Sequence, residues 1–354
     1  MNIWLLVLTM ILGIFGSWCE IYHVKHSYFV KYAYIVSFFL TCLSSLWGNL
    51  SETDLGAYLS YFLNHNDAYF GTGYVYLTNI LHFFIGESSA GYIISIIFIQ
   101  ILITYFCAVN LDLSKKYILT FFVLFNAYWG ISFSIEIIRS GLAIAFSLMA
   151  TLYALKKQAI KAFIFMLFST SMHVTEFLFL PFLIWILVGQ KRSKVVATNY
   201  ILWALVLLVL DGLGFGYALY NFIRDPILDF FKLIGSSEHY LAYFDIDIPS
   251  PFEYISKQYV FYYFLGFTLI YLQKFSNGDA RFLGGYFIGL SIHTVFSAFG
   301  ATIRLQWMYL VLSVFIVYSF ITNDSYSKFD RFLYLLLLTT AQCIMAILYL
   351  DSWW

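Results

Sequence analysis

The chain has 354 residues, of which 62% are hydrophobic and only 11% are charged, and its formal net charge is zero. Soluble domains carry about 25% charged residues, so the composition excludes an ordinary soluble protein. The lack of a basic excess argues against a nucleic-acid partner. Long apolar runs recur along the sequence and predict a polytopic integral membrane helix bundle, all-α in class.

The cysteines lie singly within these apolar runs, without the C-x-x-C spacing of a metal or redox site. They are Cys19, Cys42, Cys107 and Cys343. Because thiols in apolar runs behave as small buried hydrophobes, we expect neither a disulfide framework nor a metal site, and no cofactor. The first apolar run lacks a basic segment and a small-residue cleavage site, so we expect it to remain as a span.

In chain order, hydrophobicity predicts about 12 spans for the bundle. They lie near residues 2–19, 30–48, 91–109, 117–131, 134–155, 160–172, 174–188, 196–213, 258–273, 281–298, 303–321 and 332–350. The two short segments around His173 are expected to form a hairpin. The apolar segment 73–86 is ambiguous, since a crossing helix needs about 20 residues.

Basic residues decide how the ambiguous segment is placed, because cytoplasmic loops are enriched in Lys and Arg. The basic clusters are Lys25/Lys31, Lys115/Lys116, Lys156/Lys157/Lys161, Lys191/Arg192/Lys194, Lys274/Arg281 and Lys328/Arg331. All of them fall on the cytoplasmic side if 73–86 does not cross. We therefore expect residues 49–90 to form one outer region, with an amphipathic helix near 53–66 and a half-inserted helix at 73–86. Both ends of the chain then face outward.

A second outer region is predicted over residues 214–257, where prolines and an Asp-Ile-Asp sequence argue against a continuous span. Its Phe and Tyr residues indicate packing on the helix bundle or at the membrane interface. Asp245 and Asp247 could hold a divalent ion, but two acids alone do not define such a site. With no repeat or soluble linker, residues 1–354 are expected to form a single membrane-embedded domain.

Arg139 is the first candidate functional residue, because it lies at the outer start of the span 134–155. A guanidinium stays charged and binds phosphate bidentately, while its burial in lipid costs about 2.5–3.5 kcal/mol on insertion scales. The side chain should therefore face the bundle interior or a polar cavity. The alternative is structural: an ion pair with Glu136, three residues earlier on the same helix face.

His173 and Arg304 are predicted at the same outer level, from two other segments. His173 lies at the turn of its hairpin, where an imidazole could act as a general base; the alternative is a hydrogen-bonded interfacial histidine. Arg304 opens a later span, and its alternative role is a helix-end anchor at the headgroups. His293, in the neighbouring span, is expected near the same level.

Asp54 follows Ser51 by three residues, as in a capping box at the start of a helix. Helical spacing puts Asp54, Tyr58 and Tyr61 on one face. This face could border a sugar site, with Asp54 as a rival base and Tyr58 stacking on a sugar. Tyr74, in the next aromatic segment, is a second stacking candidate. The alternative is an interfacial helix that Asp54 merely caps.

Two arginines and a histidine from three distant segments are thus expected at one membrane depth. A shared outward-facing site for an anion explains this pattern, and two arginines suit a diphosphate. The sequence has no P-loop, G-x-G-x-x-G, H-E-x-x-H or Cys/His metal cluster. It also lacks a chain of buried acids across the spans, which proton-coupled transporters need.

The order of these elements resembles the EpsG-like, Wzy-type family of bacterial polysaccharide polymerases. Thr53, Asp54 and Tyr58 match the family's "TD…Y" pattern after the second span, and "GTGYVYL" at 71–77 partly matches "EPGY…L". The family's Arg and Gly before the "TD" are absent here, and so is the Glu-Pro before the Gly-Tyr pair.

The later family patterns are matched more closely. The pattern "IR…LA" opens a span at 138–143 and includes Arg139, and a Lys-Lys turn follows. The next span ends in "H.S", matched by His173 with Thr175 at the serine position, and Arg304 supplies a late arginine that opens a span. The resemblance covers most of residues 40–190 and extends more loosely to about 320.

The resemblance implies a multi-pass enzyme of the bacterial inner membrane, with a GT-C-like fold and an active site facing the periplasm. Such enzymes polymerise oligosaccharide repeat units linked to undecaprenyl diphosphate into O-antigen or a related surface polysaccharide, a step in lipopolysaccharide biosynthesis. The lipid-linked oligosaccharide and membrane lipid would be the partners, and a chain-length regulator protein is a further candidate. Tyr58 and Tyr74 would contact sugars.

The chemistry expected of such an enzyme gives each charged candidate a role. Arg139 and Arg304 would bind the diphosphate and stabilise the charge that grows on it as the leaving group. His173 would be either a third phosphate contact or the base that takes the proton of the acceptor hydroxyl, with Asp54 and Glu136 as rival bases. This scheme requires no metal.

Two other functions remain open from the sequence. One is a ligase or another glycosyltransferase that acts on the same lipid-linked sugars, and the other is a flippase that transports them. Only a polymerase yields a ladder of product lengths. A transporter would need polar residues along a whole pathway, whereas this chain concentrates them at one face.

Overall fold

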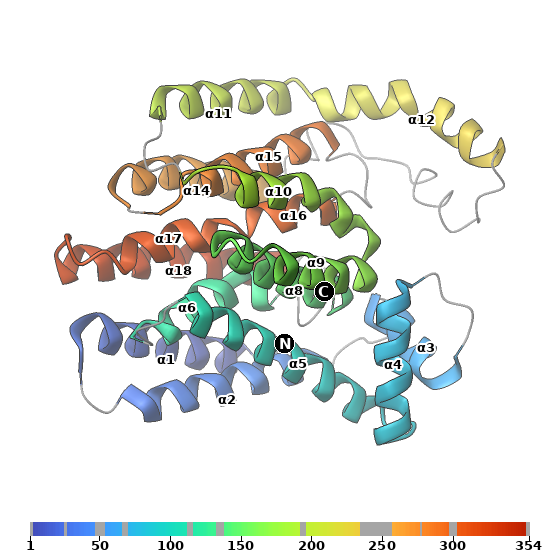
Figure 1. Cartoon of the computed structure of the whole chain (residues 1–354), viewed down its shortest axis with the longest axis horizontal. Helices are drawn as coiled ribbons and strands as arrows, with labels where there is room; N and C mark the ends of the chain where they lie inside the picture. The colour runs from blue at the N-terminus through green and yellow to red at the C-terminus, as the bar shows by residue number, and fades with distance from the viewer. Residues whose placement is uncertain are drawn as a thin grey trace. The chain divides into compact units, whose positions relative to one another are not determined.

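A computed structural model of the chain describes residues 3–24, 27–46, 54–65, 70–111, 116–131, 138–191, 196–233, 257–276, 278–296 and 303–351 (Figure 1). Every regular element among these residues is a helix, which confirms the all-α class. By length and composition, four of the described helices could cross a membrane, or five if a bent pair forms one span. Several predicted spans correspond to shorter apolar helices, so a total of about 12 spans stays a prediction.

The helices group into two compact units, each of which is described by itself. Unit 1 comprises Met1–Gln190 and Val317–Trp354, and unit 2 comprises Lys191–Ile316. The single domain expected over residues 1–354 stays a prediction.

Unit 1 contains most of the elements that carry the predicted site. Its elements are α1 (Ile3–Tyr22), α2 (Ser27–Leu46), α3 (Asp54–Asn64), α4 (Thr72–Ile85), α5 (Ser89–Leu111), α6 (Ile118–Phe125), the π-helix η1 (Asn126–Gly130), α8 (Ile138–Leu155), α9 (Ala159–Met172), the 3-10 helix η2 (Val174–Phe179), α10 (Leu180–Val188) and α18 (Lys328–Asp351). The predicted outer helices at 53–66 and 73–86 correspond to α3 and α4. Helix α17 (Ser313–Ile321) begins in unit 2 and ends in unit 1.

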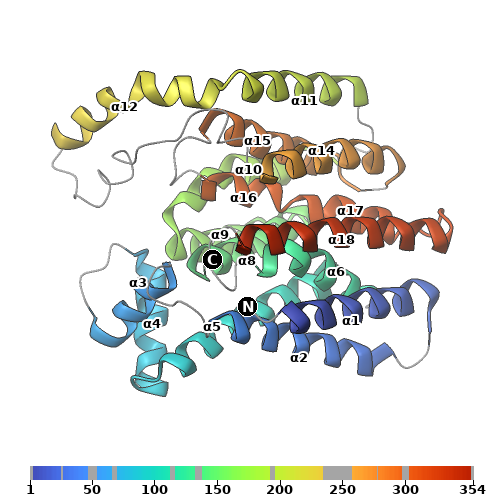
Figure 2. The ribbon, with the colours of Figure 1, turned by 180° about the vertical axis from the view of Figure 1, so that it is seen from behind.

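The first two helices form an antiparallel hairpin that both views show (Figures 1 and 2). The hydroxyl of Thr9 on α1 lies 2.6 Å from that of Ser37 and 2.8 Å from that of Thr41, both on α2. Hydroxyl contacts of this kind join helices in lipid, where water cannot replace them.

The start of α6 is capped by an acid from α1. The carboxylate of Glu20 accepts hydrogen bonds from the backbone N–H groups of Leu119 and Thr120, each at 2.8 Å, and from the Thr120 hydroxyl at 2.9 Å. The first N–H groups of a helix have no intrahelical partner, and the helix dipole favours an anion there. Glu20 therefore anchors the end of α1 to the start of α6.

Unit 2 is made of five helices among the described residues, besides the start of α17. They are α11 (Ala197–Gly212), α12 (Phe215–Leu233), α14 (Lys257–Phe275), α15 (Arg281–Phe296) and α16 (Ile303–Leu310). In both views α11 runs beside α14 and α15 (Figures 1 and 2). The axes of α11 and α12 differ by 62°. The break is at Gly214, whose φ of 67° suits a residue without a side chain.

Two predicted segments are seen in more detail in the structure. The outer region 214–257 was not expected to form a continuous span; α12 covers its first part and runs through Pro226 to Leu233, while the remainder, 234–256 with Asp245 and Asp247, lies outside the described residues. The predicted span 303–321 is two helices, α16 and α17, joined by a turn at 311–312. Hydrophobicity does not indicate this turn, because Val311 and Leu312 are themselves apolar.

The cap on α6 gives the first prediction. Replacing Glu20 with Ala leaves two buried N–H groups without an acceptor, and each such group costs about 1–3 kcal/mol. We expect a clear fall in the thermal unfolding midpoint of the detergent-solubilised protein. Glu87→Ala, which removes an exposed acid from the end of α4, is the control and should leave the midpoint unchanged. Equal midpoints for the two variants would contradict the capping role.

Candidate functional site

The hairpin of α8 and α9 brings the two best-matched family residues to one end. Arg139 lies in the first turn of α8, and His173 directly follows the last residue of α9. The two helices are antiparallel neighbours joined by a tight turn at Lys157, whose φ is 59°. Along their seam the Ser169 hydroxyl donates to the carbonyl of Ala143 at 2.8 Å. The Lys-Lys turn of the family pattern therefore joins α8 and α9 into a hairpin, and Arg139 and His173 lie at its open end.

The turn itself has a structural role that the sequence did not reveal. The ammonium of Lys157 donates to the carbonyls of Ile186, Leu187 and Gly189 at 3.0, 2.8 and 2.7 Å. These carbonyls end α10 and lack intrahelical donors. A cation there is also favoured by the helix dipole, so Lys157 joins the hairpin turn to α10.

Arg139 lies against aromatic rings. Its guanidinium carbon is 5.1 Å from the ring centre of Phe70 and 5.8 Å from that of Tyr58, both within the range of a cation–π contact. The Nε atom is buried and has no hydrogen-bond acceptor among the residues that the structure describes. The proposed partner Glu136 lies outside those residues.

The rings around Arg139 form what we call the aromatic cluster: Tyr58, Tyr61, Phe70 and Tyr74. The ring centre of Phe70 lies 5.2, 5.3 and 5.7 Å from those of Tyr58, Tyr61 and Tyr74, and Tyr58 is 5.4 Å from Tyr74. Tyr58 and Tyr61 thus share one face of α3, as their spacing predicted. The hydroxyl of Tyr74 is hydrogen-bonded to that of Tyr92 on α5, which fixes the inner edge of the cluster.

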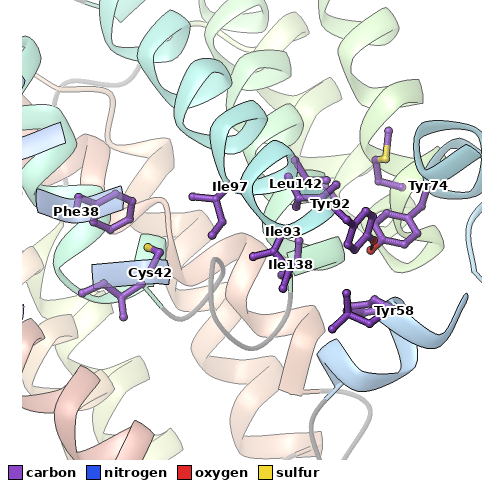
Figure 3. Packing of buried hydrophobic residues seen from close by; sticks show 14 of the residues in the cluster. Phe38, Cys42, Tyr58, Tyr74, Tyr92, Ile93, Ile97, Ile138 and Leu142 are labelled. Atoms are coloured by element: carbon purple, nitrogen blue, oxygen red, sulfur yellow. Dashed lines mark hydrogen bonds between the residues drawn. The ribbon is translucent and has the colours of Figure 1, made fainter. Parts of the chain in front are cut away.

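Figure 3 shows Tyr74 and Tyr92 next to each other with Tyr58 close by, inside the buried core of unit 1. Tyr58 is 2% exposed and Tyr74 is fully buried. Sugar binding by these two tyrosines stays a prediction, and their burial favours a different role, which is to hold the guanidinium of Arg139.

Two glycines let the segment before α4 approach the open end of the hairpin. A side chain at Gly71 would put its Cβ 2.3 Å from the carbonyl oxygen of Ser171, and one at Gly73 would put it 2.1 Å from the Ser171 hydroxyl. Both distances are far below van der Waals contact. The Gly-x-Gly-Tyr sequence is therefore needed because α4 packs directly on the end of α9, next to His173.

His173 is held by its own turn. Its backbone caps α9 by donating to the carbonyl of Ser169 at 3.0 Å, and its Nδ1 is hydrogen-bonded to the Thr175 hydroxyl. The ring is 6% exposed. A hydrogen bond at Nδ1 fixes the ring orientation and directs Nε2, the atom that would take or give a proton.

An acid beside His173 was not among the predicted site residues. Glu176 is 1% exposed, and its carboxylate accepts a hydrogen bond from the hydroxyl of Ser147 on α8 at 2.8 Å. The Ser147 hydroxyl oxygen also lies 2.7 Å from the hydroxyl oxygen of Ser169 on α9. The acid thus ties η2, the element after His173, to both helices of the hairpin. The sequence signal was an acid in an apolar segment one turn after the histidine.

The other predicted site residues are described only in part. Asp54 begins α3, and Arg304 lies in the first turn of α16, but neither side chain is among those described; Glu136 is not described at all. Arg304 belongs to unit 2, so its convergence with Arg139 stays a prediction. Within unit 2, His293 at the end of α15 is hydrogen-bonded to Gln306, which places it near the start of α16.

Within the described ranges, no three His, Cys, Asp or Glu side chains lie together in a way that could hold a metal ion.

These features define a polytopic helical membrane protein with an arginine and a histidine at the open end of a helical hairpin. The family model of the EpsG family matches residues 30–353, nearly the whole chain, and the chain therefore belongs to the EpsG family. Searches of curated proteins and of solved structures found no significant match.

The glycine contacts give the second prediction. Gly71→Ala should lower the thermal unfolding midpoint, because the new Cβ would meet a backbone oxygen of α9; overpacking of this kind costs about 1–3 kcal/mol. Gly212→Ala, at the end of α11, meets no atom within 4 Å and is the matched control. If Gly71→Ala unfolded at the same temperature as the control, the close approach of α4 to α9 would be wrong.

Proposed function

We propose that the chain polymerises oligosaccharide repeat units carried on undecaprenyl diphosphate into O-antigen or a related surface polysaccharide, at the outer face of the bacterial inner membrane. Membership of the EpsG family indicates a polysaccharide polymerase-type function in general. The apolar helices are those of a membrane protein. The lipid diphosphate, the membrane and its outer face are the parts that we add.

The observation that carries this proposal is the environment of Arg139. Two other arginines of the chain are buried and each has an acid: Arg281 pairs with Asp279 at 2.5 Å and Arg331 with Asp324 at 2.7 Å. Arg139 is half-buried and has aromatic rings but no acid beside it among the residues described. A desolvated cation without an anion is costly, so this guanidinium is suited to receive an anion from outside the chain.

The aromatic rings make this arrangement tolerable in the absence of the anion. A cation over an aromatic ring is stabilised by about 0.5–2 kcal/mol, which offsets part of the cost of desolvation. Rings also leave the N–H groups free, whereas an acid would occupy them. The parallel N–H groups of the guanidinium can then donate to two oxygens of a phosphate or diphosphate.

The reaction requires such a cation. In glycosyl transfer, positive charge develops on the sugar while negative charge grows on the leaving group, which would be undecaprenyl diphosphate. A preorganised guanidinium stabilises that charge more in the transition state than in the ground state, and this difference is what accelerates the step. Arg139 is proposed for this role, with Arg304 as a second cation predicted from sequence.

His173 is proposed as the group that contacts the acceptor hydroxyl or a phosphate oxygen. Its position beside the packed end of α4 and its fixed Nδ1 support this role, because a base must be held in one orientation to act. Asp54 and Glu136 remain rival bases.

The third prediction tests the proposed cation. In a polymerase-deficient host, Arg139→Ala should reduce polymer formation by about 100-fold or more, as the loss of a transition-state contact does. Arg139→Lys keeps the positive charge but loses the bidentate hydrogen bonding of the guanidinium, so it should retain an intermediate level of polymer formation. The measurement is the ladder of product lengths on a gel, at matched protein levels.

The control for this test is Lys161→Ala. Lys161 lies on the same hairpin and also sits over an aromatic ring, 5.4 Å from the centre of Tyr153, but at the opposite end. Lys161→Ala should leave the ladder of product lengths unchanged. A normal ladder from Arg139→Ala would refute the proposed site, and a single product in place of a ladder from the unaltered protein would indicate a ligase.

The fourth prediction concerns the orientation of His173. Thr175→Val removes the hydroxyl that binds Nδ1 and should slow polymer formation by roughly five-fold, since one hydrogen bond in a buried site contributes about 1 kcal/mol. Thr175→Ser keeps the hydroxyl and should act like the unaltered chain. Equal rates for the two variants would show that this hydrogen bond does not position the histidine.

A further inference from the structure

A carboxyl group in unit 2 lies at the break between α11 and α12. Asp211 is in the last turn of α11 and remains partly exposed. The chain then turns at Gly214, whose N–H donates to the Asp211 carbonyl at 2.9 Å. By the distribution of basic residues, α11 begins on the cytoplasmic side, so this end is predicted to lie at the outer face.

Hydroxyl groups from two other helices converge on one oxygen of this carboxyl group. The hydroxyl of Tyr263 on α14 donates to Oδ2 of Asp211, and that of Thr294 on α15 lies 3.1 Å from the same atom. The two hydroxyls are 3.1 Å apart. The other oxygen, Oδ1, has no hydrogen-bond partner within the described part of the chain, so the carboxyl group is oriented through one oxygen and open at the other.

The position is unfavourable for an acid. The carboxyl end of a helix carries partial negative charge, and an acid there is disfavoured by about 0.3–1 kcal/mol. No ion pair joins Asp211 to a basic side chain among the described residues of unit 2. An asparagine would accept the same two hydrogen bonds without this cost. Holding three helices together therefore does not account for the charge, and violations of this kind occur mainly at functional sites.

A second polar contact in unit 2 joins α15 to α16. His293, which precedes Thr294 on α15, is hydrogen-bonded to Gln306 on α16. Gln306 is 1% exposed, and its amide nitrogen has no acceptor in the part of the chain that is described. A buried amide donor without an acceptor is rare in proteins. Helix α15 therefore carries polar contacts both to α11 and to α16, the helix whose first turn contains Arg304.

We propose that Asp211, oriented by Tyr263 and Thr294, binds hydroxyl groups of a saccharide through its open oxygen. The inference rests on the proposed function, since the saccharide would be the oligosaccharide part of the lipid-linked substrate. The two hydroxyl groups already donate toward Asp211, so the site mainly offers acceptors, and sugar hydroxyls are donors. A divalent cation would need several further oxygen ligands, most often including more than one carboxylate.

The test uses the full chain in detergent and a saccharide without its lipid. Lipid-linked oligosaccharide from a host lacking this chain is treated with mild acid, and the released oligosaccharide is titrated against the protein by saturation-transfer NMR. We expect Asp211→Asn to bind roughly ten-fold more weakly, because it keeps the two hydroxyl contacts but loses the charged acceptor. Its thermal unfolding midpoint should be unchanged.

Two controls separate this inference from the proposed function. Asp225→Asn removes an exposed acid from α12 and should bind the oligosaccharide normally. Arg139→Ala should also bind it normally, since the released oligosaccharide has no diphosphate, while it makes no polymer. Loss of polymer in Arg139→Ala together with full binding by Asp211→Asn would overturn the saccharide site and leave the polymerase proposal standing.

Other outcomes are equally decisive. If the unaltered chain does not bind the released oligosaccharide, the saccharide site is wrong. If Asp211→Asn fails to fold, Tyr263→Phe, which removes only a hydroxyl, is measured in its place. It should bind about three-fold more weakly, and full binding by this variant would also overturn the inference.

Discussion

A half-buried guanidinium packed against aromatic rings, with no acid beside it in the described structure, is the constraint on which the arrangement of unit 1 depends. Arg139 must be kept from the lipid, which would exclude its charge, and also from a protein carboxylate, which would occupy its N–H groups. Tyr58 and Phe70 meet both requirements. The remaining contacts hold these rings in place: the hydroxyl pair of Tyr74 and Tyr92, and the close approach of Gly71 to α9.

Two buried acids, Glu20 and Glu176, differ from Arg139 because their partners lie within the protein. Glu20 is satisfied by the first N–H groups of α6, and Glu176 by a serine of α8, so both stabilise contacts between helices. Asp211 differs because it lies at the carboxyl end of a helix and is partly exposed, with both of its donors on one oxygen. The two proposals rest on Arg139, which suits an anion, and on Asp211, which suits a donor of hydrogen bonds.

Much of the fold could be predicted from the sequence, because a helix in lipid must be apolar over its length. The segment 73–86 was placed within one residue of α4, and the short hairpin around His173 was expected. The break between α16 and α17 and the helix α12 were not, since neither depends on hydrophobicity. In the site, the distribution of basic residues predicted Arg139 and His173 at one level of the membrane, and the hairpin of α8 and α9 puts them at one end. The burial of Tyr58 and the need for Gly71 could not be predicted, because both depend on contacts between segments far apart in sequence.

The central claim, that Arg139 receives a lipid diphosphate, is tested most directly by comparing two lipids on the purified protein. The affinities of undecaprenyl diphosphate and of undecaprenol, which has the same chain and no phosphate, are measured in the same detergent for the unaltered chain and for Arg139→Ala. The account predicts that the diphosphate binds at least ten-fold more tightly than the alcohol and that Arg139→Ala loses this preference while binding the alcohol unchanged. Equal binding of the two lipids by the unaltered chain, or an undiminished preference in Arg139→Ala, would contradict it.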